Sequence, residues 1–338
     1  MKAIQISGLH QLDVVEVDAP RMGDDEVLLR ICYAGFCGSD LNTWRGGNPM
    51  AKMPVIPGHE VGAVIEAVGC NVPEGLQPGM SVTVNPYTNC GKCASCRNGR
   101  VNACEYNQTL GVQRDGAMCE RIAVPWQKVI PAGRLTPRTG ALIEPMSVGF
   151  HAVSRAQVTD IDTVLVIGCG MVGMGAVVRA AQRGATVIAA DLDDEKLALA
   201  REMGAAYTLN TRTEDLHGQL RAMTGGFGPD VVIEAVGSPK TYQLTVEEVA
   251  FTGRVICIGY AKSEVSFQTK LFVQKELDIR GSRNAQPSDF RAVIRYLERG
   301  TCPVDRLISR EVSPEEAAAA MQAWDADPGR VFRILVKF

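Results

Sequence analysis

The sequence lacks any run approaching the roughly 20 uninterrupted apolar residues that a membrane-spanning helix needs. It also lacks clustered basic residues, and its formal net charge is only -3, so neither a nucleic-acid-binding surface nor a polybasic membrane patch is indicated. The first residues, MKAIQISGLHQLDVVEV, alternate as a β-strand does and do not form an export signal. We therefore expect a cytoplasmic protein that acts on a small molecule and binds neither nucleic acid nor membrane.

Internal repeats and low-complexity tracts are absent as well. The chain has 338 residues, 46% hydrophobic and 22% charged, which allows a sizeable core and predicts two domains. It has 11 cysteines, an odd number, and four of them lie within fifteen residues. In a long chain without an export signal, this crowding indicates metal binding rather than disulfides.

The sequence pattern changes near residue 162. Before about residue 140, short β-branched runs such as EVLLRI and SVTVN alternate with Gly, Pro and Asn, which predicts a β-rich domain with long loops. After residue 162, apolar runs such as TVLVIG and DVVIEAV alternate with helical segments, as in a parallel sheet covered on both faces. The predicted fold class is therefore α/β, with a second, β-rich domain.

A glycine-rich motif, GCGMVG, follows the apolar strand TVLVI and opens an Ala-rich helix. Gly168 makes the turn, Gly170 lets the backbone approach a pyrophosphate, and Gly173 lets helix and strand pack closely. Asp191 ends the next strand, where its carboxylate can accept hydrogen bonds from ribose hydroxyls and repel a 2′-phosphate. The motif predicts a Rossmann domain that prefers NAD to NADP; the alternative is a glycine-rich turn with a surface aspartate.

The four crowded cysteines form a second motif. Cys90, Cys93, Cys96 and Cys104 stand in CGKCASCRNGRVNAC, a spacing that lets four thiolates close around one tetrahedral zinc ion. Four protein ligands leave no open coordination position, so this zinc is expected to brace the fold without taking part in chemistry. The alternative is a set of ordinary reduced cysteines.

Three further segments, AGFCGSDLNTWRG, PVIPGHEVGAVIEAVG and ALIEPMSVGFHAV, together with these two motifs, resemble the zinc-containing medium-chain alcohol and polyol dehydrogenases. The resemblance covers essentially the entire chain. It implies a β-rich GroES-like catalytic domain at 1–152, to which 290–338 return. It also implies a Rossmann NAD-binding domain with a parallel six-stranded sheet at 153–289.

The resemblance further implies a catalytic zinc held by Cys37, His59 and Glu144, the last matching the acidic position of the sorbitol dehydrogenase branch. Glu60 matches a residue that approaches or exchanges at this metal. One thiolate, one imidazole and one carboxylate leave a fourth position for water or substrate oxygen, so zinc there stabilises an alkoxide while hydride passes to the nicotinamide. Without the resemblance, Cys37 also fits a small buried residue, His59 a loop histidine, and Glu144 a helix-start carboxylate.

Ser39 and Asp40, which follow Cys37, complete the implied catalytic set, whereas Asn42 departs from it. Asp40 matches a carboxylate that orients the ligand histidine, and Ser39 matches the hydroxyl that receives the substrate proton. Many relatives pass that proton to solvent through a histidine, but Asn42 stands at this position and cannot carry it, which leaves water or a ribose hydroxyl to replace it. His151, two helical turns after Glu144, fits either that role or simple helix packing.

Additional cofactor contacts are expected at the start of the glycine-loop helix and after the later strands of the Rossmann sheet. These residues are Met171, Val172, Ala235, Val236, Gly237, Ile258, Gly259, Ser282, Arg283 and Asn284.

The segment GSRNAQPSDF (281–290) resembles bacterial dehydrogenases that act on L-galactonate or L-gulonate at carbon 5. Arg283 offers a forked cation suited to a carboxylate, although it fits a cofactor-facing or surface cation equally well. We therefore expect an NAD-dependent, zinc-dependent dehydrogenase that oxidises a secondary hydroxyl of a sugar acid to a ketone. The alternatives are a neutral polyol dehydrogenase of sorbitol or galactitol type, more distantly a threonine dehydrogenase, and a non-catalytic protein that kept the fold.

Two expectations concern stoichiometry. The enzyme should hold two zinc ions per chain, one catalytic and one structural. The apolar run RVICIGY is expected at a sheet edge, where relatives pair two sheets across a dimer, so we expect a homodimer or homotetramer.

Overall fold

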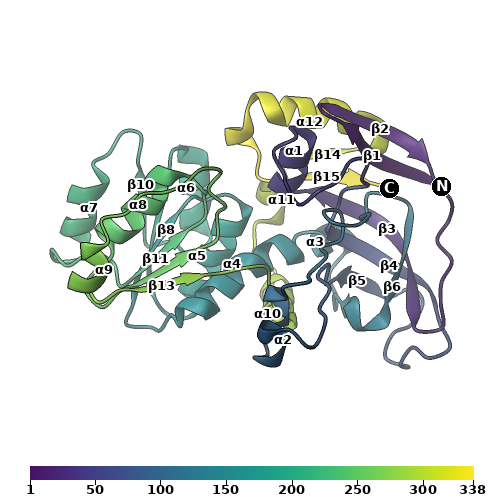
Figure 1. Cartoon of the computed structure of the whole chain (residues 1–338), viewed down its shortest axis with the longest axis horizontal. Helices are drawn as coiled ribbons and strands as arrows, with labels where there is room; N and C mark the ends of the chain where they lie inside the picture. The colour runs from purple at the N-terminus through teal and green to yellow at the C-terminus, as the bar shows by residue number, and fades with distance from the viewer. The chain divides into compact units, whose positions relative to one another are not determined.

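The computed structural model describes all 338 residues, which form two compact units. Unit 1 comprises Met1–Glu144 and Gln286–Phe338, and unit 2 comprises Pro145–Ala285, so the chain leaves the first unit and later returns to it (Figure 1). The boundary expected after residue 152 lies inside a single helix, α4 (Ile143–Ala156), which carries the chain from unit 1 into unit 2.

Unit 1 is built on a seven-stranded sheet in the order β14-β15-β3-β4-β5-β7, with β6 paired to β3, and on the separate hairpin β1-β2. The strands are β1 (Lys2–Gly8), β2 (Gln11–Glu16), β3 (Glu26–Phe36), β4 (Glu60–Val68), β5 (Ser81–Val84), β6 (Arg121–Pro125), β7 (Val129–Pro131), β14 (Arg310–Val312) and β15 (Ile334–Lys337). The helices are short: α1 (Gly38–Trp44), α2 (Ala94–Arg97), α3 (Pro137–Gly140), α10 (Pro287–Leu297), α11 (Val304–Leu307), α12 (Ala317–Ala326) and the 3₁₀ helices η1 (Val101–Ala103), η2 (Trp126–Lys128), η3 (Pro314–Glu316) and η4 (Pro328–Arg330).

The central strands of unit 1 show the alternation that fixes which face is buried. In β3, Val27, Leu29 and Ile31 are buried, and every second residue between them is more exposed. Because side chains alternate across a strand, this pattern points one face of β3 into the core. Antiparallel pairing with β4 places Gly35, near the end of β3, opposite Glu60, the first residue of β4.

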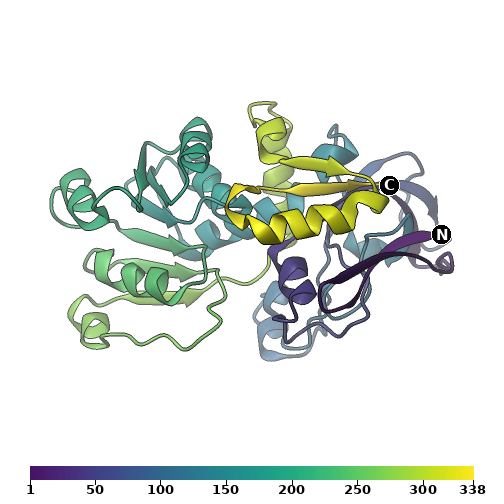
Figure 2. The ribbon, with the colours of Figure 1, turned by 90° about the horizontal axis from the view of Figure 1, so that it is seen from above.

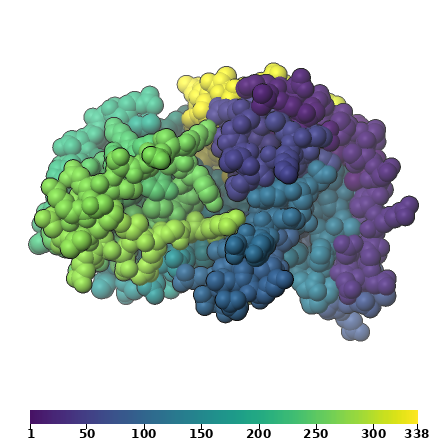
Figure 3. All heavy atoms as spheres, viewed as in Figure 1, coloured from purple at the N-terminus to yellow at the C-terminus, as the bar shows by residue number.

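The C-terminal segment returns to the N-terminal part of the chain. Strand β15 pairs antiparallel with β3, with Ile334 opposite Phe36, and α12 packs against β2. Figures 2 and 3 show this segment in yellow beside the purple N-terminal strands. The return therefore places residues near 333 beside the end of β3, although about 300 residues separate the two segments in sequence.

Unit 2 contains a six-stranded parallel sheet in the order β10-β9-β8-β11-β12-β13, which confirms the predicted Rossmann topology. The strands are β8 (Thr163–Ile167), β9 (Thr186–Asp191), β10 (Tyr207–Asn210), β11 (Val231–Glu234), β12 (Arg254–Cys257) and β13 (Asp278–Gly281). The consecutive residues Val164, Leu165 and Val166 are all fully buried, so both faces of the sheet are covered. The helices after α4 are α5 (Met171–Gln182), α6 (Asp194–Glu202), α7 (Leu216–Met223), α8 (Pro239–Glu248) and α9 (Lys270–Gln274).

One expectation about this sheet is wrong. The run RVICIGY contains β12, which lies inside the sheet between β11 and β13, and the strand at that edge is β13. Continuous apolarity marks a strand buried on both sides, whereas β13 (DIRG) carries charged residues, as edge strands commonly do. None of the helices combines the length and apolar character needed to cross a bilayer.

Candidate metal centres and cofactor site

The four cysteines of the predicted structural zinc site converge in unit 1. The Sγ atoms of Cys90, Cys93, Cys96 and Cys104 all lie within 4.8 Å of one another, in a loop that contains only α2 and η1. The backbone N–H of Cys93 donates to Cys90 Sγ at 3.3 Å, and the N–H of Cys90 donates to Cys104 Sγ at 3.3 Å. Because N–H groups aimed at sulfur stabilise thiolates, this four-cysteine cluster fits one tetrahedral zinc ion.

Two of the four thiols, those of Cys93 and Cys96, differ in how readily they ionise. A hydrogen bond with the Ser95 hydroxyl, whose oxygen lies 3.2 Å from the sulfur, is the main cause that lowers the pKa of Cys93 to about 5. Burial raises the pKa of Cys96 to about 11. At neutral pH the protein alone therefore offers one ready thiolate and one thiol that must lose its proton before it can bind a metal.

A second cluster forms where β3 ends and β4 begins. Cys37 follows directly after β3 and caps α1, and His59 directly precedes Glu60, which opens β4. Because these two strand ends are paired, the ligand atoms of Cys37, His59 and Glu60 lie within 4.8 Å of one another. The sheet thus brings together three of the residues that the resemblance assigns to the catalytic metal.

The chemistry of this Cys37–His59–Glu60 cluster suits a cation. Burial opposes ionisation of Cys37, but the adjacent His59 outweighs it and lowers the pKa of the thiol. Burial also opposes protonation of His59, yet the Cys37 thiolate raises its pKa well above the usual value. His59 Nδ1 is buried without a hydrogen-bond partner. A thiol with a lowered pKa, a buried imidazole and a fully buried carboxyl group fit a zinc ion, whose positive charge would stabilise the anionic forms of the thiol and the carboxyl group.

Arg333 is a member of this site that no sequence signal identified. Its Nε lies 3.0 Å from Glu60 Oε2, and its guanidinium also donates to the Phe36 carbonyl. Burial raises the pKa of Glu60, and the nearby Arg333 charge opposes that shift. A Cβ at Gly35 would collide with the Glu60 carboxylate and crowd the Arg333 side chain, so Gly35 provides the space for this buried ion pair.

Glu144 lies outside the compact cluster but within its electrostatic reach. It is 3% exposed, and its Oε1 accepts a hydrogen bond from the Tyr87 hydroxyl. Its charge contributes to the raised pKa of His59, for which Cys37 is the largest raising cause against burial, and to the raised pKa of Glu60, for which burial is the largest cause. Tyr87 is a second residue that sequence patterns did not reveal, because nothing in an isolated tyrosine marks it as the partner of a distant carboxylate.

The contacts of Asp40 and Ser39 in α1 differ in part from the roles that the family resemblance implies. Asp40 is buried, and its carboxylate accepts the backbone N–H of Cys37 at 2.8 Å, which caps α1. It thereby fixes Cys37, whereas His59 Nδ1 has no hydrogen-bond partner. The Ser39 hydroxyl is buried without a hydrogen-bond partner, which leaves it available to a ligand. His151 lies buried in α4, on the unit 2 side of the boundary.

The glycine loop of unit 2 has the geometry that a pyrophosphate site requires. Gly168 follows β8 with a φ of 92°, a value that favours glycine. A Cβ at Gly173 would collide with the Gly168 carbonyl oxygen, whereas a Cβ at Gly170 would meet nothing within 4 Å. Gly170 caps α5, so its open side lies at a helix N-terminus, where an anion is favoured, and Met171 and Val172 follow it.

The other predicted cofactor residues stand at the carboxyl ends of neighbouring strands. Asp191 ends β9, and its carboxylate accepts the N–H groups of Cys169 at 2.6 Å and Leu192 at 2.7 Å, so it lies beside the glycine loop. In a parallel sheet these ends share one edge, which is where such folds bind dinucleotides. The remaining residues follow β11 (Ala235, Val236, Gly237), β12 (Ile258, Gly259) and β13 (Ser282, Arg283, Asn284).

Comparison with known proteins gives a family match for each of the two units. Residues 23–134 match the family model of the alcohol dehydrogenase GroES-like domain, and residues 172–299 match that of zinc-binding dehydrogenases. The chain is 36% identical over 292 residues to L-galactonate-5-dehydrogenase of Escherichia coli K12, covering 86% of each chain. It is 32% identical to sorbitol dehydrogenase of Bacillus subtilis, covering 95% of this chain and 93% of the relative.

A solved structure extends the likeness to the complete fold. An alcohol dehydrogenase from Escherichia coli CFT073, in complex with NADH, superposes with a TM-score of 0.91 at 31% identity and covers 100% of this chain and 99% of its own. Together with the two family models and the 36% identical relative, this shows that the chain belongs to the zinc-dependent alcohol and polyol dehydrogenases, with a GroES-like domain and a Rossmann domain.

Proposed function

We propose that this enzyme oxidises a secondary hydroxyl of a sugar acid, of the L-galactonate or L-gulonate type, to a ketone with NAD⁺. The oxidoreductase class follows from the family. The Cys37–His59–Glu60 cluster is the observation that carries the chemistry, because it gathers metal-ligand side chains in a buried position beside the unpartnered Ser39 hydroxyl. The 36% identity to L-galactonate-5-dehydrogenase supports the substrate class.

The residues of the chain divide the work of this reaction. Zinc, when bound, supplies Lewis-acid polarisation of the substrate hydroxyl, and the nicotinamide supplies the hydride acceptor. Cys37, His59 and Glu144 hold the metal in this proposal, and Glu60 approaches it while tethered to Arg333. Ser39 Oγ, which is buried and unpartnered, takes the proton that the substrate hydroxyl loses and passes its own hydroxyl proton to water or to a ribose hydroxyl of the cofactor, because Asn42 cannot carry it.

The ligand assignment can be tested by replacing zinc with cobalt, whose absorption reports its ligands. We expect Glu144→Gln to change the cobalt spectrum and to reduce metal retention, because it removes a charged oxygen ligand. Glu60→Gln should change the spectrum less. The reverse order would assign the third ligand to Glu60, which the 4.8 Å cluster already includes.

NAD is the proposed cofactor because Asp191 ends β9 beside the glycine loop. A carboxylate there accepts hydrogen bonds from ribose hydroxyls and repels the 2′-phosphate of NADP. The NADH complex of the structural relative supports this choice. Wild-type kcat/KM should favour NAD⁺ over NADP⁺, and Asp191→Ser should narrow that ratio by about tenfold or more. A wild-type enzyme that prefers NADP⁺ would contradict the assignment.

The substrate class is decided by initial rates on L-galactonate, L-gulonate, sorbitol, galactitol and threonine. We expect the acids to be fastest, and we expect Arg283→Gln to raise KM for the acids only, since its guanidinium suits a carboxylate. A matched control is Arg201→Gln, because that guanidinium bonds Thr208 Oγ1 at 3.1 Å. Faster turnover of the neutral polyols would favour the second candidate, a sorbitol-type dehydrogenase, which the 32% identity to that enzyme supports.

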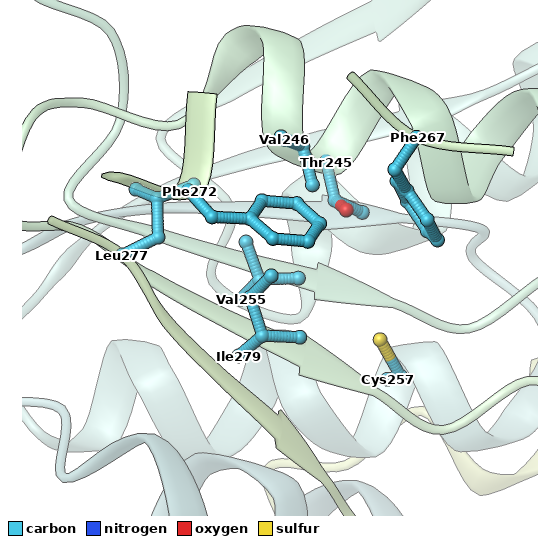
Figure 4. Close-up of a pocket in the computed structure, with 8 residues that line it drawn as sticks. All are labelled: Thr245, Val246, Val255, Cys257, Phe267, Phe272, Leu277 and Ile279. Carbon is cyan, nitrogen blue, oxygen red and sulfur yellow. The ribbon is translucent and has the colours of Figure 1, made fainter. Parts of the chain in front are cut away.

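We further propose that the enzyme is a homodimer or homotetramer that associates through the β13 edge. This edge has no neighbouring strand, and Ile279 on it is 44% exposed. Beside it lies an apolar pocket of about 500 Å³, flanked by Phe267 and Phe272 (Figure 4). An unpaired strand next to an apolar hollow is a common basis for association. Light scattering should give a multiple of the 36.4 kDa chain mass, and Ile279→Lys should reduce it; a monomeric wild type would contradict the proposal.

A further inference from the structure

Glu234 is a buried carboxylate that neither the sequence patterns nor the family comparison assign to a role. It is the last residue of β11 and is fully buried, yet no arginine, lysine or histidine forms an ion pair with it. Its Oε1 accepts hydrogen bonds from the N–H groups of Val236 at 2.9 Å and Gly237 at 2.7 Å, and from Thr241 Oγ1 at 2.7 Å. The carboxylate therefore ties the turn after β11 to the first turn of α8.

The backbone of the same residue ties a second turn to the first. The Glu234 carbonyl accepts the N–H groups of Ile258 at 2.9 Å and Gly259 at 3.3 Å, which follow β12. Gly237 has a φ of 80°, and a Cβ added at Gly259 would collide with the backbone nitrogen of Gly237. The two turns thus touch through glycine backbone, and this contact depends on each turn keeping one conformation.

A third connection reaches the glycine loop. The N–H of Ala235 donates to the Ile167 carbonyl at 2.9 Å, and Ile167 directly precedes Gly168. A Cβ at Gly168 would collide with the Val236 side chain. The segment that Glu234 fixes is consequently the one against which the glycine loop rests.

The three hydrogen bonds that Glu234 Oε1 accepts do not by themselves require a charged side chain. Its Oε2 is buried without a hydrogen-bond partner, so only one of the two side-chain oxygens is satisfied. A glutamine could accept the same three bonds through its oxygen without burying a charge. Bonds to a carboxylate are roughly twice as strong as bonds to a neutral acceptor, so a carboxylate at this position holds the turn more tightly than an amide would.

We propose that Glu234 is a positioning residue of the cofactor site, which holds the turns 235–237 and 258–259 in the conformation that the dinucleotide binds. This inference rests on the proposed NAD-dependent function. Turns that are already ordered need not lose conformational freedom on binding, so the tether increases affinity without touching the ligand.

The test measures binding of NAD⁺ by calorimetry together with zinc content, thermal midpoint and steady-state kinetics. Glu234→Gln keeps the acceptor and should weaken binding about threefold, whereas Glu234→Ala removes it and should weaken binding by more than about tenfold. KM for NAD⁺ should rise in the same order, with zinc content unchanged. Glu248→Gln is the matched control, because Glu248 is also buried in unit 2 but pairs with His217 at 3.1 Å.

A second pair of variants serves if Glu234→Ala does not fold. Thr241→Val removes one donor to the carboxylate and should weaken NAD⁺ binding, and Thr241→Ser, which keeps the hydroxyl, should restore it. Wild-type affinity in Glu234→Gln and Thr241→Val, with only the thermal midpoint lowered, would overturn the positioning role. Failure of the wild-type enzyme to bind either NAD⁺ or NADP⁺ would overturn the proposed function itself, and with it this inference.

Discussion

The two cysteine-containing clusters of unit 1 obtain their geometry in opposite ways. The four-cysteine cluster takes all its donors from one loop of fifteen residues, with N–H groups of the same loop aimed at the sulfurs. The Cys37–His59–Glu60 cluster takes its donors from the ends of two paired strands, and Arg333 from the returning C-terminal segment holds one of them.

This difference indicates which cluster depends on its metal. The four thiols stand on one loop outside the sheet, so zinc bound there would add to the energy that orders the loop. A sheet holds its strand ends in place whether or not a metal is bound, so the Cys37–His59–Glu60 cluster is preorganised, which the proposed catalytic role requires. Removing a metal-ligand side chain from the four-cysteine cluster should therefore unfold that loop. Removing one from the Cys37–His59–Glu60 cluster should instead inactivate the enzyme.

The largest expected effect comes from exchanging one cysteine in each cluster. Cys37→Ser should reduce kcat/KM by about 10³-fold or more, since the metal contributes several kcal/mol of transition-state stabilisation, and should barely change the thermal midpoint. Cys93→Ser should lower the thermal midpoint by about 10 °C or more. Activity, calorimetric melting and zinc content per chain would be measured on both, with Cys70→Ser, at an exposed cysteine, as the control. Loss of stability in Cys37→Ser equal to that in Cys93→Ser would abolish the distinction.

The contrast also explains how much of the molecule the sequence predicts. The four cysteines and the glycine loop are contiguous motifs, so their spacing alone specifies the geometry that the structure shows. The parallel sheet follows from equally local alternation of strands and helices. Cys37 follows β3 and His59 precedes β4, so no local motif joins them; only the family resemblance predicts that they meet, and the pairing of β3 with β4 brings them together.

The remaining site residues depend on contacts that no local pattern encodes. Arg333 reaches Glu60 because β15 pairs with β3, and Tyr87 meets Glu144 across 57 positions of sequence. The strand at the sheet edge differs from the expected one for a related reason: the apolarity of RVICIGY indicates burial, whereas the edge position depends on which strand comes last in the sheet.

The next largest effect should follow from removing Arg333, the cation that pairs with Glu60 of the Cys37–His59–Glu60 cluster. Arg333→Met removes the cation that pairs with the fully buried Glu60 and lowers its pKa most, which leaves His59 as the other positive neighbour, and breaking a buried pair in this way costs about 3–5 kcal/mol. Urea unfolding of the zinc-free protein would measure the loss. The double variant Glu60→Gln/Arg333→Met should recover much of it, and Arg330→Met, at an arginine whose side chain is 83% exposed, should change little. Equal effects of Arg330 and Arg333 would show that the ion pair does not stabilise the site.

The four-cysteine cluster should respond to pH in a way set by its unequal thiols. Because the pKa of Cys96 is raised to about 11, it is protonated at neutral pH and must release that proton when zinc binds, whereas Cys93, at about 5, is already ionised. Zinc affinity should therefore rise with pH between about 6 and 9, by about tenfold per pH unit for each proton released. Chelator competition in the Cys37→Ser background isolates this site, and calorimetry in buffers of different ionisation enthalpy counts the protons. Affinity that does not change over this range would contradict the assignment.

The smallest effect should come from the hydrogen bond between Ser95 and Cys93. Ser95→Ala removes the hydroxyl that lies 3.2 Å from the thiolate, and should weaken zinc binding at the four-cysteine cluster by about three- to tenfold while the other ligands remain. Turnover at saturating zinc should not change, because the hydrogen bond between Ser95 and Cys93 is not part of the Cys37–His59–Glu60 cluster. Ser154→Ala is the matched control, since its hydroxyl donates to Phe150 O within α4 of unit 2. If Ser95→Ala reduced kcat with zinc fully bound at both sites, the two clusters would be coupled, and the division between a stabilising loop and a preorganised reactive site would have to be abandoned.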